Sequence, residues 1–172
     1  VLRDSQVNNP DTGERIAAPI RTSSEAGIDP VSEDLALRAV QRRIASAAGA
    51  DLPCAEPLTL LRYAPGQEYR PHRDYIAPRA LEDENPGAGN RARTICVYLN
   101  APEAGGETEF PMAGIRVAPK PGRAAIFDNM AFDAAHPDGR PDPESLHAGL
   151  PVVRGEKWLA TLWLRQRRYR GF

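Results

Sequence analysis

The sequence is poor in lysine, cysteine and histidine, and it lacks long apolar runs. Two Cys in 172 residues are too few for a disulfide framework, and only three His are present. The 22 basic and 23 acidic residues leave a net charge of -1, which disfavours a general nucleic-acid or membrane-surface binder. No apolar run reaches about 18 residues and no signal-peptide pattern occurs, so we expect a cytoplasmic protein without a nucleic-acid or membrane partner.

Lysine is the scarcest charged residue, since Lys120 and Lys157 stand against twenty Arg. Lys120 lies in a Pro-Gly turn, where an exposed position explains the presence of a charged residue. Residues 155–163 alternate like a strand, which places Lys157 on one face with Leu159, Thr161 and Trp163. A lysine there either extends to solvent or is buried and needs an anion. Because composition favours Arg by about ten to one, we interpret Lys157 as a compact charge for a carboxylate ligand.

The length and the apolar pattern predict one domain of mainly β structure. Residues 31–48 carry apolar side chains at three- and four-residue steps, between Asp29-Pro30 and Gly49, and predict one amphipathic helix. Short runs rich in branched or aromatic residues predict strands at 58–63, 94–99, 115–118, 124–128 and 158–164. The expected fold class is mainly β with a flanking helix (α+β), as a sheet sandwich or barrel.

The remaining segments show no sustained period. Residues 1–30 are polar, with a turn at 8–13, and residues 76–92 and 129–146 are long and rich in Pro and Gly. We predict that these two long segments are loops, either lids that close over a ligand or disordered. The arginine-rich segment 165–170 is interpreted as a solvated chain end, and Cys54 and Cys96 as free thiols.

The candidate metal ligands begin with a His-x-Asp pair. His72 and Asp74 are two residues apart, so on a strand both side chains project from one face. A third ligand from His136 or His147 would complete the two-histidine, one-carboxylate triad of non-haem Fe(II) oxygenases. A lone His-x-Asp pair is common by chance, and a surface position for both residues is the alternative.

A series of segments resembles the prolyl 4-hydroxylases, which are Fe(II)- and 2-oxoglutarate-dependent dioxygenases. The segment 60–74, LLRYAPGQEYRPHRD, looks like their first metal motif. Further matches follow in the family's order at 90–94, 97–100, 105–111, 145–152 and 155–158, and the resemblance covers about residues 20 to 165. The ordered series is far more specific than the His-x-Asp pair alone.

This resemblance implies a fold, a set of site residues and a set of cofactors. The implied fold is a double-stranded β-helix (jelly-roll) core. The implied catalytic residues are the Fe(II) ligands His72, Asp74 and His147, together with Lys157, which would pair with the far carboxylate of 2-oxoglutarate. The resemblance also implies that Tyr63, Tyr98 and Thr161 line the cosubstrate pocket and that Tyr69, Arg91 and Trp163 lie near the substrate. His136 is then a loop histidine.

The implied reaction is hydroxylation of a prolyl residue in a peptide or protein. It uses O2, converts 2-oxoglutarate to succinate and CO2, and employs ascorbate as reductant. Two alternatives remain: the same chemistry on a small molecule such as a free amino acid, and a non-catalytic metal-binding barrel. We expect residues 1–172 to form a single catalytic domain that lacks the family's N-terminal strand and helix. Because the chain begins at Val1, we interpret it as excised from a longer protein. The sequence does not specify an oligomeric state.

Overall fold

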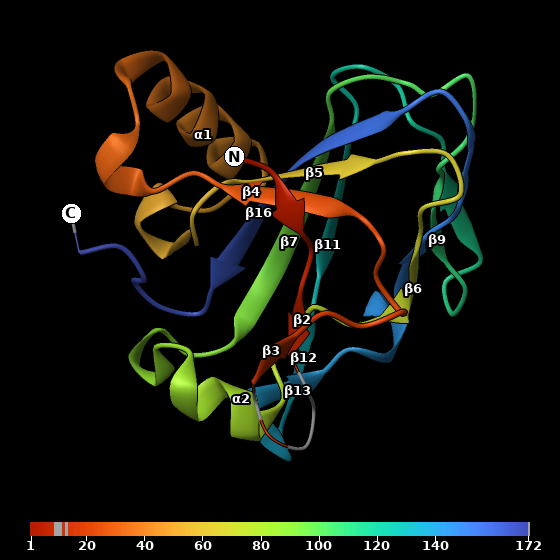
Figure 1. The fold of residues 1–172 in the computed structure, drawn as a ribbon. Helices are drawn as coiled ribbons and strands as arrows, with labels where there is room; N and C mark the ends of the chain where they lie inside the picture. Colours follow the sequence, from red (N-terminus) through yellow and green to blue (C-terminus); the bar gives the residue numbers. More distant parts are fainter. Residues whose placement is uncertain (9–11, 13, 172) are drawn as a thin grey trace.

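Two antiparallel β-sheets face each other and form most of the fold (Figure 1). The structure is a computed structural model and describes residues 1–8, 12 and 14–171. The larger sheet has the order β1 (Arg3–Asp4), β4 (Ser24–Gly27), β5 (Thr59–Tyr63), β16 (Lys157–Arg165), β7 (Arg91–Tyr98) and β11 (Ala124–Asp128). The smaller has the order β10 (Ile115–Val117), β9 (Thr108–Phe110), β14 (His147–Gly149) and β6 (Tyr69–His72). This arrangement confirms the mainly β fold class, a double-stranded β-helix.

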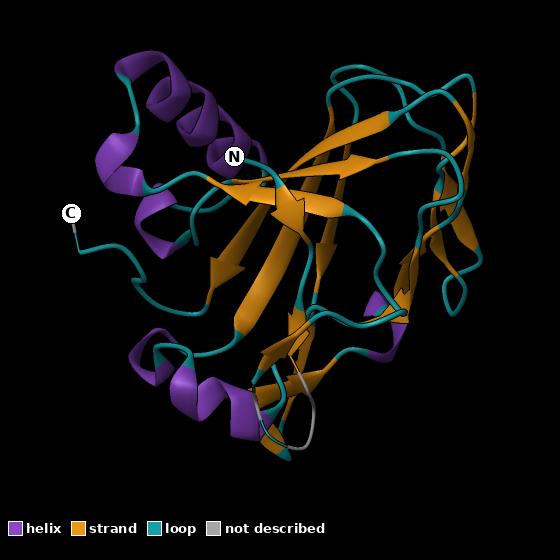
Figure 2. Cartoon of the chain, in the orientation of Figure 1, coloured by secondary structure: helices purple, strands orange, loops and turns teal. Residues whose placement is uncertain are grey.

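Short two-stranded sheets and helices complete the fold (Figure 2). Three two-stranded sheets pair β2 (Val7–Asn8) with β3 (Arg15–Ile16), β8 (Ala104–Gly105) with β15 (Val152–Arg154), and β12 (Met130–Asp133) with β13 (His136–Pro141). The helices are α1 (Leu35–Ala47) and α2 (Pro78–Asp83), with 3-10 turns η1 (Pro30–Ser32), η2 (Leu52–Cys54), η3 (Pro86–Ala88) and η4 (Pro143–Ser145). No helix in the described part of the chain has the length and apolarity needed to cross a membrane.

The predicted helix is confirmed as α1, and it packs on one face of the larger sheet. Asp34 caps it, because its carboxylate accepts a hydrogen bond from the Leu37 backbone N–H at 2.7 Å. The buried residues of α1 and η2 pack against Ile95 of β7 and Leu162 of β16. Side chains alternate along a strand, so the neighbouring residues of β7 and β16 point to the opposite face. That opposite face is turned toward the smaller sheet and carries a second buried cluster that includes Tyr63, Tyr98 and Leu159.

Two of the predictions for the irregular segments are wrong, and residues 1–30 contain strands that the sequence did not predict. The first 30 residues contain β1 to β4, and β4 pairs with β5 in the larger sheet. Residues 76–92 contain α2 and η3, and residues 129–146 contain the β12–β13 hairpin and η4. These elements have two to six residues each, which is too short for an apolar period to develop. Much of the turn predicted at 8–13 lies outside the described residues.

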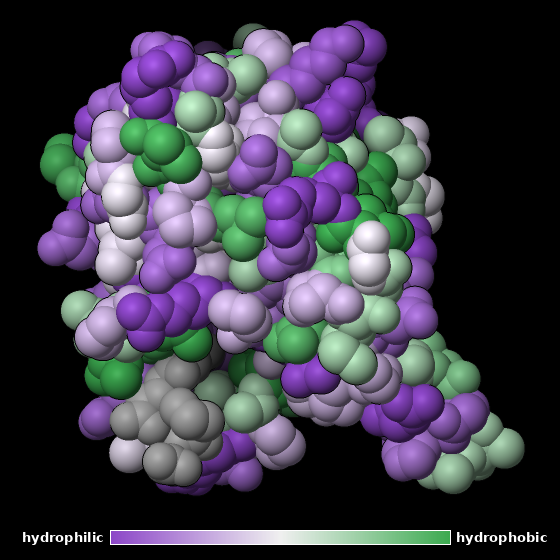
Figure 3. Space-filling view, turned by 90° about the vertical axis from the view of Figure 1, so that its right-hand side faces the viewer, coloured by the Kyte–Doolittle hydropathy of each residue, from purple (hydrophilic) through white to green (hydrophobic). Residues whose placement is uncertain are grey.

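The arginine-rich C-terminal segment is built into the fold, which corrects the expectation of a solvated end. Arg165 and Arg170 are 3% and 4% exposed. Arg165 donates to the carbonyl of Gly89 at 2.8 Å and to Glu56 at 3.1 Å. Arg170 donates to Gln41 of α1 at 2.7 Å. Elsewhere the surface is mixed, and hydrophilic and hydrophobic residues are interspersed over the face shown in Figure 3.

Candidate active site

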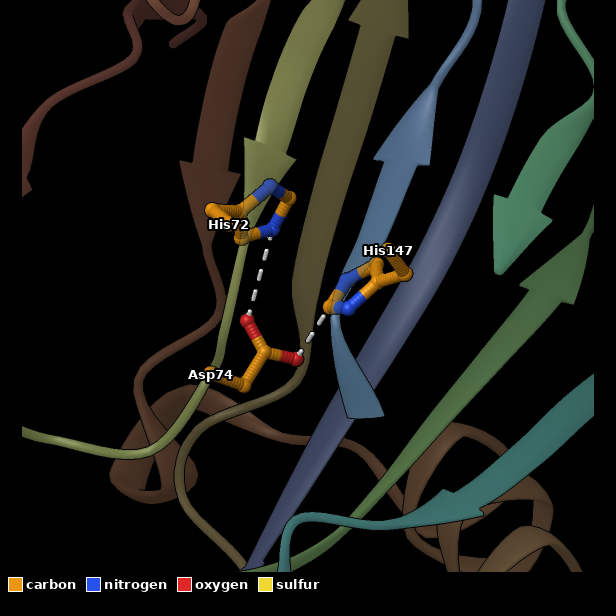
Figure 4. A group of neighbouring side chains, drawn as sticks. All are labelled: His72, Asp74 and His147. Atoms are coloured by element: carbon orange, nitrogen blue, oxygen red, sulfur yellow. Dashed lines mark ion pairs between the residues drawn. The ribbon is translucent and has the colours of Figure 1, made fainter. Parts of the chain in front are cut away.

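His72, Asp74 and His147 converge between the ends of two paired strands (Figure 4). His72 ends β6 and His147 begins β14, and the two residues are partners in the antiparallel register. Asp74 follows β6 by two residues. One potential ligand atom from each residue lies within 4.8 Å of the others. His136 is on the β12–β13 hairpin and bonds Asp133 instead, so the structure brings His147 rather than His136 to the His-x-Asp pair.

Both histidines are oriented by backbone carbonyl groups. Nδ1 of His72 is 2.8 Å from the carbonyl oxygen of Arg70, and Nδ1 of His147 is 2.9 Å from that of Ser145. A carbonyl only accepts, so each Nδ1 carries the hydrogen and each Nε2 keeps a free lone pair. This arrangement is the usual way in which metal-binding imidazoles are fixed in one tautomer.

The charge states in this cluster also suit a cation. Burial and the neighbouring His147 lower the pKa of His72, so its ring is neutral near pH 7. Burial alone would favour the neutral acid at Asp74. The imidazoles, the guanidinium of Arg91 and a hydrogen bond from Thr94 outweigh burial and hold the pKa of Asp74 below its usual range. The neutral imidazole of His72 and the ionised carboxylate of Asp74 therefore face each other, with the His147 ring beside them.

The spacing fits a single metal ion. Nε2 of His72 is 3.7 Å from Oδ1 of Asp74, and Nε2 of His147 is 3.9 Å from Oδ2. Both distances are too long for hydrogen bonds. Ligand nitrogen and oxygen atoms lie about 2.0–2.2 Å from an ion such as zinc, so two such atoms bound to one ion are separated by at most about 4.4 Å. The residues present thus fit a divalent metal in donor type, in tautomer and in the spacing of each imidazole from the carboxylate.

Lys157 is completely buried on the site face of β16, which excludes the solvent-exposed alternative. Its Nζ donates to the carbonyl oxygen of Gly106 at 2.9 Å and lies 4.3 Å from the ring centre of Tyr63. Burial lowers the pKa of Lys157 to about 8. Gly106 has a φ of +79°, and a Cβ there would be 3.2 Å from Cδ of the lysine, so a side chain at position 106 would crowd the lysine side chain. Within the described structure, the ammonium's hydrogen bond goes to a carbonyl and leaves donors for an anion.

The other predicted cosubstrate residues lie on the strands beside Lys157. The register pairs Lys157 with Tyr63 of β5 and Leu159 with Tyr98 of β7. Tyr98 is fully buried and donates to Thr108 at 2.6 Å. Thr161 is 2% exposed and lies beside Cys96, whose thiol has its pKa raised to about 12 by burial. Cys54 and Cys96 are free thiols, as predicted.

The predicted substrate residues line a cavity of about 780 Å³ that reaches His72 and Asp74. The Tyr69 ring stacks on the His72 ring with centroids 3.3 Å apart. The Arg91 guanidinium lies 4.2 Å from the ring centre of Trp163. The cavity therefore has aromatic and cationic walls next to the potential metal ligands.

Sequence reasoning missed several residues of this site. Arg21 lines the cavity, is 8% exposed and lies 4.9 Å from the Tyr69 ring centre. Glu56 binds Arg91 through two hydrogen bonds of 2.7 Å and so holds it against Trp163. Thr94 donates to Asp74 at 2.7 Å. Contacts between segments that are distant in the sequence bring these residues to the site, and their spacing in the sequence does not identify them as site residues.

Two histidines and one carboxylate inside a double-stranded β-helix are typical of mononuclear non-haem iron oxygenases. The family model described as the 2OG-Fe(II) oxygenase superfamily matches residues 58–165. The matched range contains the predicted metal, cosubstrate and substrate residues. The chain belongs to this superfamily.

Its relatives are prolyl hydroxylases, which confirms the resemblance in the motifs. Prolyl 4-hydroxylase 1 of Arabidopsis thaliana is 35% identical over 96% of this chain and 61% of its own length. Prolyl 4-hydroxylase subunit alpha-1 of Gallus gallus is 34% identical over 96% of this chain and 31% of its own length. The viral collagen prolyl hydroxylase of Paramecium Bursaria Chlorella virus-1, solved as a 2OG complex, superposes with a TM-score of 0.66 at 31% identity, covering 84% of this chain and 79% of that one. The chain thus spans less than two thirds of the curated relatives' length.

Proposed function

We propose that this protein is a 2-oxoglutarate- and Fe(II)-dependent dioxygenase that hydroxylates a prolyl residue in a peptide or protein. The observation that carries the proposal is the convergence of two Nε2 atoms and one carboxylate in a fold that also buries the Lys157 ammonium. The curated relatives named prolyl 4-hydroxylases support the substrate class. The viral relative solved as a 2OG complex supports the cosubstrate.

In this proposal the chain's residues bind and orient the reacting groups. His72, Asp74 and His147 would hold Fe(II), and three protein ligands leave positions for 2-oxoglutarate and O2. Lys157 would pair with the far carboxylate of 2-oxoglutarate, in a pocket lined by Tyr63, Tyr98 and Thr161. When bound, iron and 2-oxoglutarate supply the oxidising power to hydroxylate an unactivated C–H bond, with succinate and CO2 as products and ascorbate as reductant.

The cavity walls would position the peptide. Tyr69 and Trp163 offer flat apolar surfaces for a prolyl ring, and Arg91 is held by Glu56 where it can donate to a peptide carbonyl. Because His72 and Asp74 also line this cavity, a prolyl residue seated there lies next to the metal ligands. Peptide binding at this place would also exclude water from the reacting groups.

Turnover assays with a panel of substrates test the proposal. Purified protein with Fe(II), ascorbate and 2-oxoglutarate should form succinate in the presence of proline-containing peptides, and mass spectrometry should find one added oxygen on proline. Matched peptides with alanine in place of proline are the control. Turnover with free proline but with none of the peptides would assign a small-molecule substrate. No succinate with any substrate, together with no anaerobic metal-to-cosubstrate absorption band, would contradict the proposal.

The affinity for 2-oxoglutarate should depend on pH through Lys157. Its pKa of about 8 in the free protein lies below the ordinary value of 10.5, so the ammonium that attracts the dianion is present below pH 8 and is lost above it. We expect a constant Kd between pH 6.5 and 7.5 and a rise of about tenfold per pH unit above 8.5. Titration of 2-oxoglutarate by tryptophan fluorescence measures this. A Kd that stays flat to pH 9.5 would contradict it.

The same shift has a consequence for folding stability. Between pH 8 and 10.5 the unfolded lysine binds a proton that the folded lysine has released. Stability rises with pH wherever the unfolded state binds more protons. Lys157 therefore contributes a stability gain across this window in the ligand-free protein, opposite in direction to the loss of 2-oxoglutarate affinity. In general alkaline unfolding, folding stability and 2-oxoglutarate affinity would fall together. A rise in stability with a loss of affinity indicates a local effect of Lys157 on ligand binding.

A further inference from the structure

One oxygen of the Asp74 carboxylate takes two hydrogen bonds from the larger sheet. Oδ2 accepts from the Thr94 hydroxyl at 2.7 Å and from Nε1 of Trp163 at 2.9 Å. Thr94 of β7 and Trp163 of β16 are partners in the antiparallel register, so their side chains project together from the site face. Oδ2 has two lone pairs, and these two donors occupy both. Oδ1 takes no hydrogen bond from the described residues.

The direction of the Thr94 hydrogen bond is fixed by Asn129. Nδ2 of Asn129 is 2.8 Å from Oγ1 of Thr94. An amide NH2 group only donates, so the Thr94 oxygen is the acceptor there and its own hydrogen is free to point at Asp74. If the amide were turned round, the single hydrogen of Thr94 would have to serve both the amide oxygen and the carboxylate. The 2.7 Å contact with an ionised Asp74 therefore requires the NH2 group of Asn129 to face Thr94.

Asn129 is held firmly enough to set this direction. It is completely buried, directly after β11, which pairs with β7. Its backbone N–H donates to Ala92 at 2.8 Å, and its carbonyl accepts from the backbone N–H of Asp142 at 3.0 Å. Its Oδ1 has no hydrogen-bond partner among the described residues. Buried amide oxygens normally have a hydrogen-bond partner. Because Oδ1 of Asn129 lacks one, we infer that this position is constrained by the hydrogen bond of the other amide atom, Nδ2.

We propose that Thr94, oriented by Asn129, is a positioning residue that, together with Trp163, saturates Oδ2 of Asp74 and so presents Oδ1 alone to the metal. This inference rests on the metal site of the proposed function. Oδ1 lies 3.7 Å from Nε2 of His72, whereas Oδ2, which lies 3.9 Å from Nε2 of His147, is occupied by its two donors. A carboxylate that binds through one oxygen leaves three positions open on a six-coordinate ion, whereas one that binds through both oxygens fills a fourth. The Asn129–Thr94 pair thereby preserves room for cosubstrate and O2.

Metal titration without cosubstrate tests the inference directly. Mn2+ binding is measured by the loss of the free-ion EPR signal in the wild type and in Thr94→Val, Thr94→Ser and Asn129→Ala. Loss of a residue that orients a metal ligand typically weakens metal binding about 10- to 100-fold. We expect that loss for Thr94→Val, about a tenfold loss for Asn129→Ala, and a Kd within about threefold of the wild type for Thr94→Ser, which keeps the hydroxyl.

Ile95→Val is the matched control. Ile95 is 1% exposed on the same strand but faces α1, so this variant loses packing without touching Asp74, and its Mn2+ affinity should not change. A second readout is the affinity of the Mn2+-loaded protein for 2-oxoglutarate. We expect Thr94→Val at saturating Mn2+ to bind 2-oxoglutarate at least tenfold more weakly, because a carboxylate that turns to bind through both oxygens competes with a chelating ligand.

The outcomes separate this inference from the proposed function. Mn2+ affinity that is equal in the wild type, Thr94→Val and Asn129→Ala would overturn the positioning role, whatever the protein hydroxylates. If Thr94→Val does not fold by circular dichroism, Asn129→Ala decides, and unchanged Mn2+ and 2-oxoglutarate affinities in that variant overturn the role. Weaker Mn2+ binding in both variants supports the role, even if no peptide is hydroxylated. A wild type that binds no Mn2+ would overturn both proposals together.

Discussion

Replacing Asp74 with Asn is expected to lower 2-oxoglutarate turnover to less than about one thousandth of the wild-type rate, a loss of roughly 4 kcal/mol. The reason lies in the hydrogen bonds around this side chain. To keep the bonds from Thr94 and Trp163, the amide oxygen must take the place of Oδ2. The NH2 group then faces His72, and an NH2 group has no lone pair for a metal. If the amide turns round, its oxygen faces the metal, but both donors lose their acceptor.

The expected result is measured by succinate formation and by Mn2+ titration of the same variant. Asp128→Asn is the matched control, because Asp128 is an exposed carboxylate that pairs with Arg93 on the strand edge. Its turnover should stay within about twofold of the wild type, since exposed ion pairs contribute little. Circular dichroism checks that both variants are folded. Turnover by Asp74→Asn within tenfold of the wild type would mean that this carboxylate is not a metal ligand.

The sequence predicted those parts of the fold that have a local period. The alternation over 155–163 gave the correct face for Lys157, and the helical steps in 31–48 gave α1. It did not predict β4, because its four residues have no alternation and become a strand only through pairing with β5. Nor did it predict that Arg165 and Arg170 are buried, because their partners Glu56 and Gln41 lie more than 100 positions away. Long-range pairing decides both cases.

The residues of the candidate site fall into the same two groups, those with a local pattern in the sequence and those placed by long-range contacts. The metal cluster was predicted because His72 and Asp74 are two residues apart and the segment around His147 resembles a known motif. Arg21, Glu56 and the Thr94–Asn129 pair were missed. The Thr94–Asn129 contact joins residues 35 positions apart, and a threonine in a strand most often indicates β propensity alone. The proposed ligands can be recognised from their local sequence, whereas the residues that orient them are brought to the site by the tertiary structure.

Replacing Lys157 with Ala should weaken 2-oxoglutarate binding about a thousandfold while Mn2+ affinity stays within about threefold. Truncating one partner of a buried charge pair costs about 2–5 kcal/mol, because the other charge is left unpaired away from water. The pocket around Nζ offers no substitute, since the ammonium contacts a carbonyl of Gly106 and the ring of Tyr63, and neither attracts an anion. The proposed metal ligands His72 and His147 keep the backbone carbonyl contacts that orient them, so metal binding should persist.

The chain offers a matched control in its only other lysine. Lys120→Ala removes an exposed ammonium from the turn after β10, and it should change neither affinity, which excludes a general effect of net charge. Lys157→Arg is a second comparison: it keeps the charge but replaces the compact ammonium beside Gly106 and Gly149 with a longer, planar head group. We therefore expect Lys157→Arg to bind 2-oxoglutarate poorly as well. If Lys157→Ala instead weakens Mn2+ and 2-oxoglutarate binding equally, Lys157 maintains the fold of the site rather than binding the cosubstrate. An ammonium that binds the far carboxylate would affect the 2-oxoglutarate affinity and leave the Mn2+ affinity unchanged.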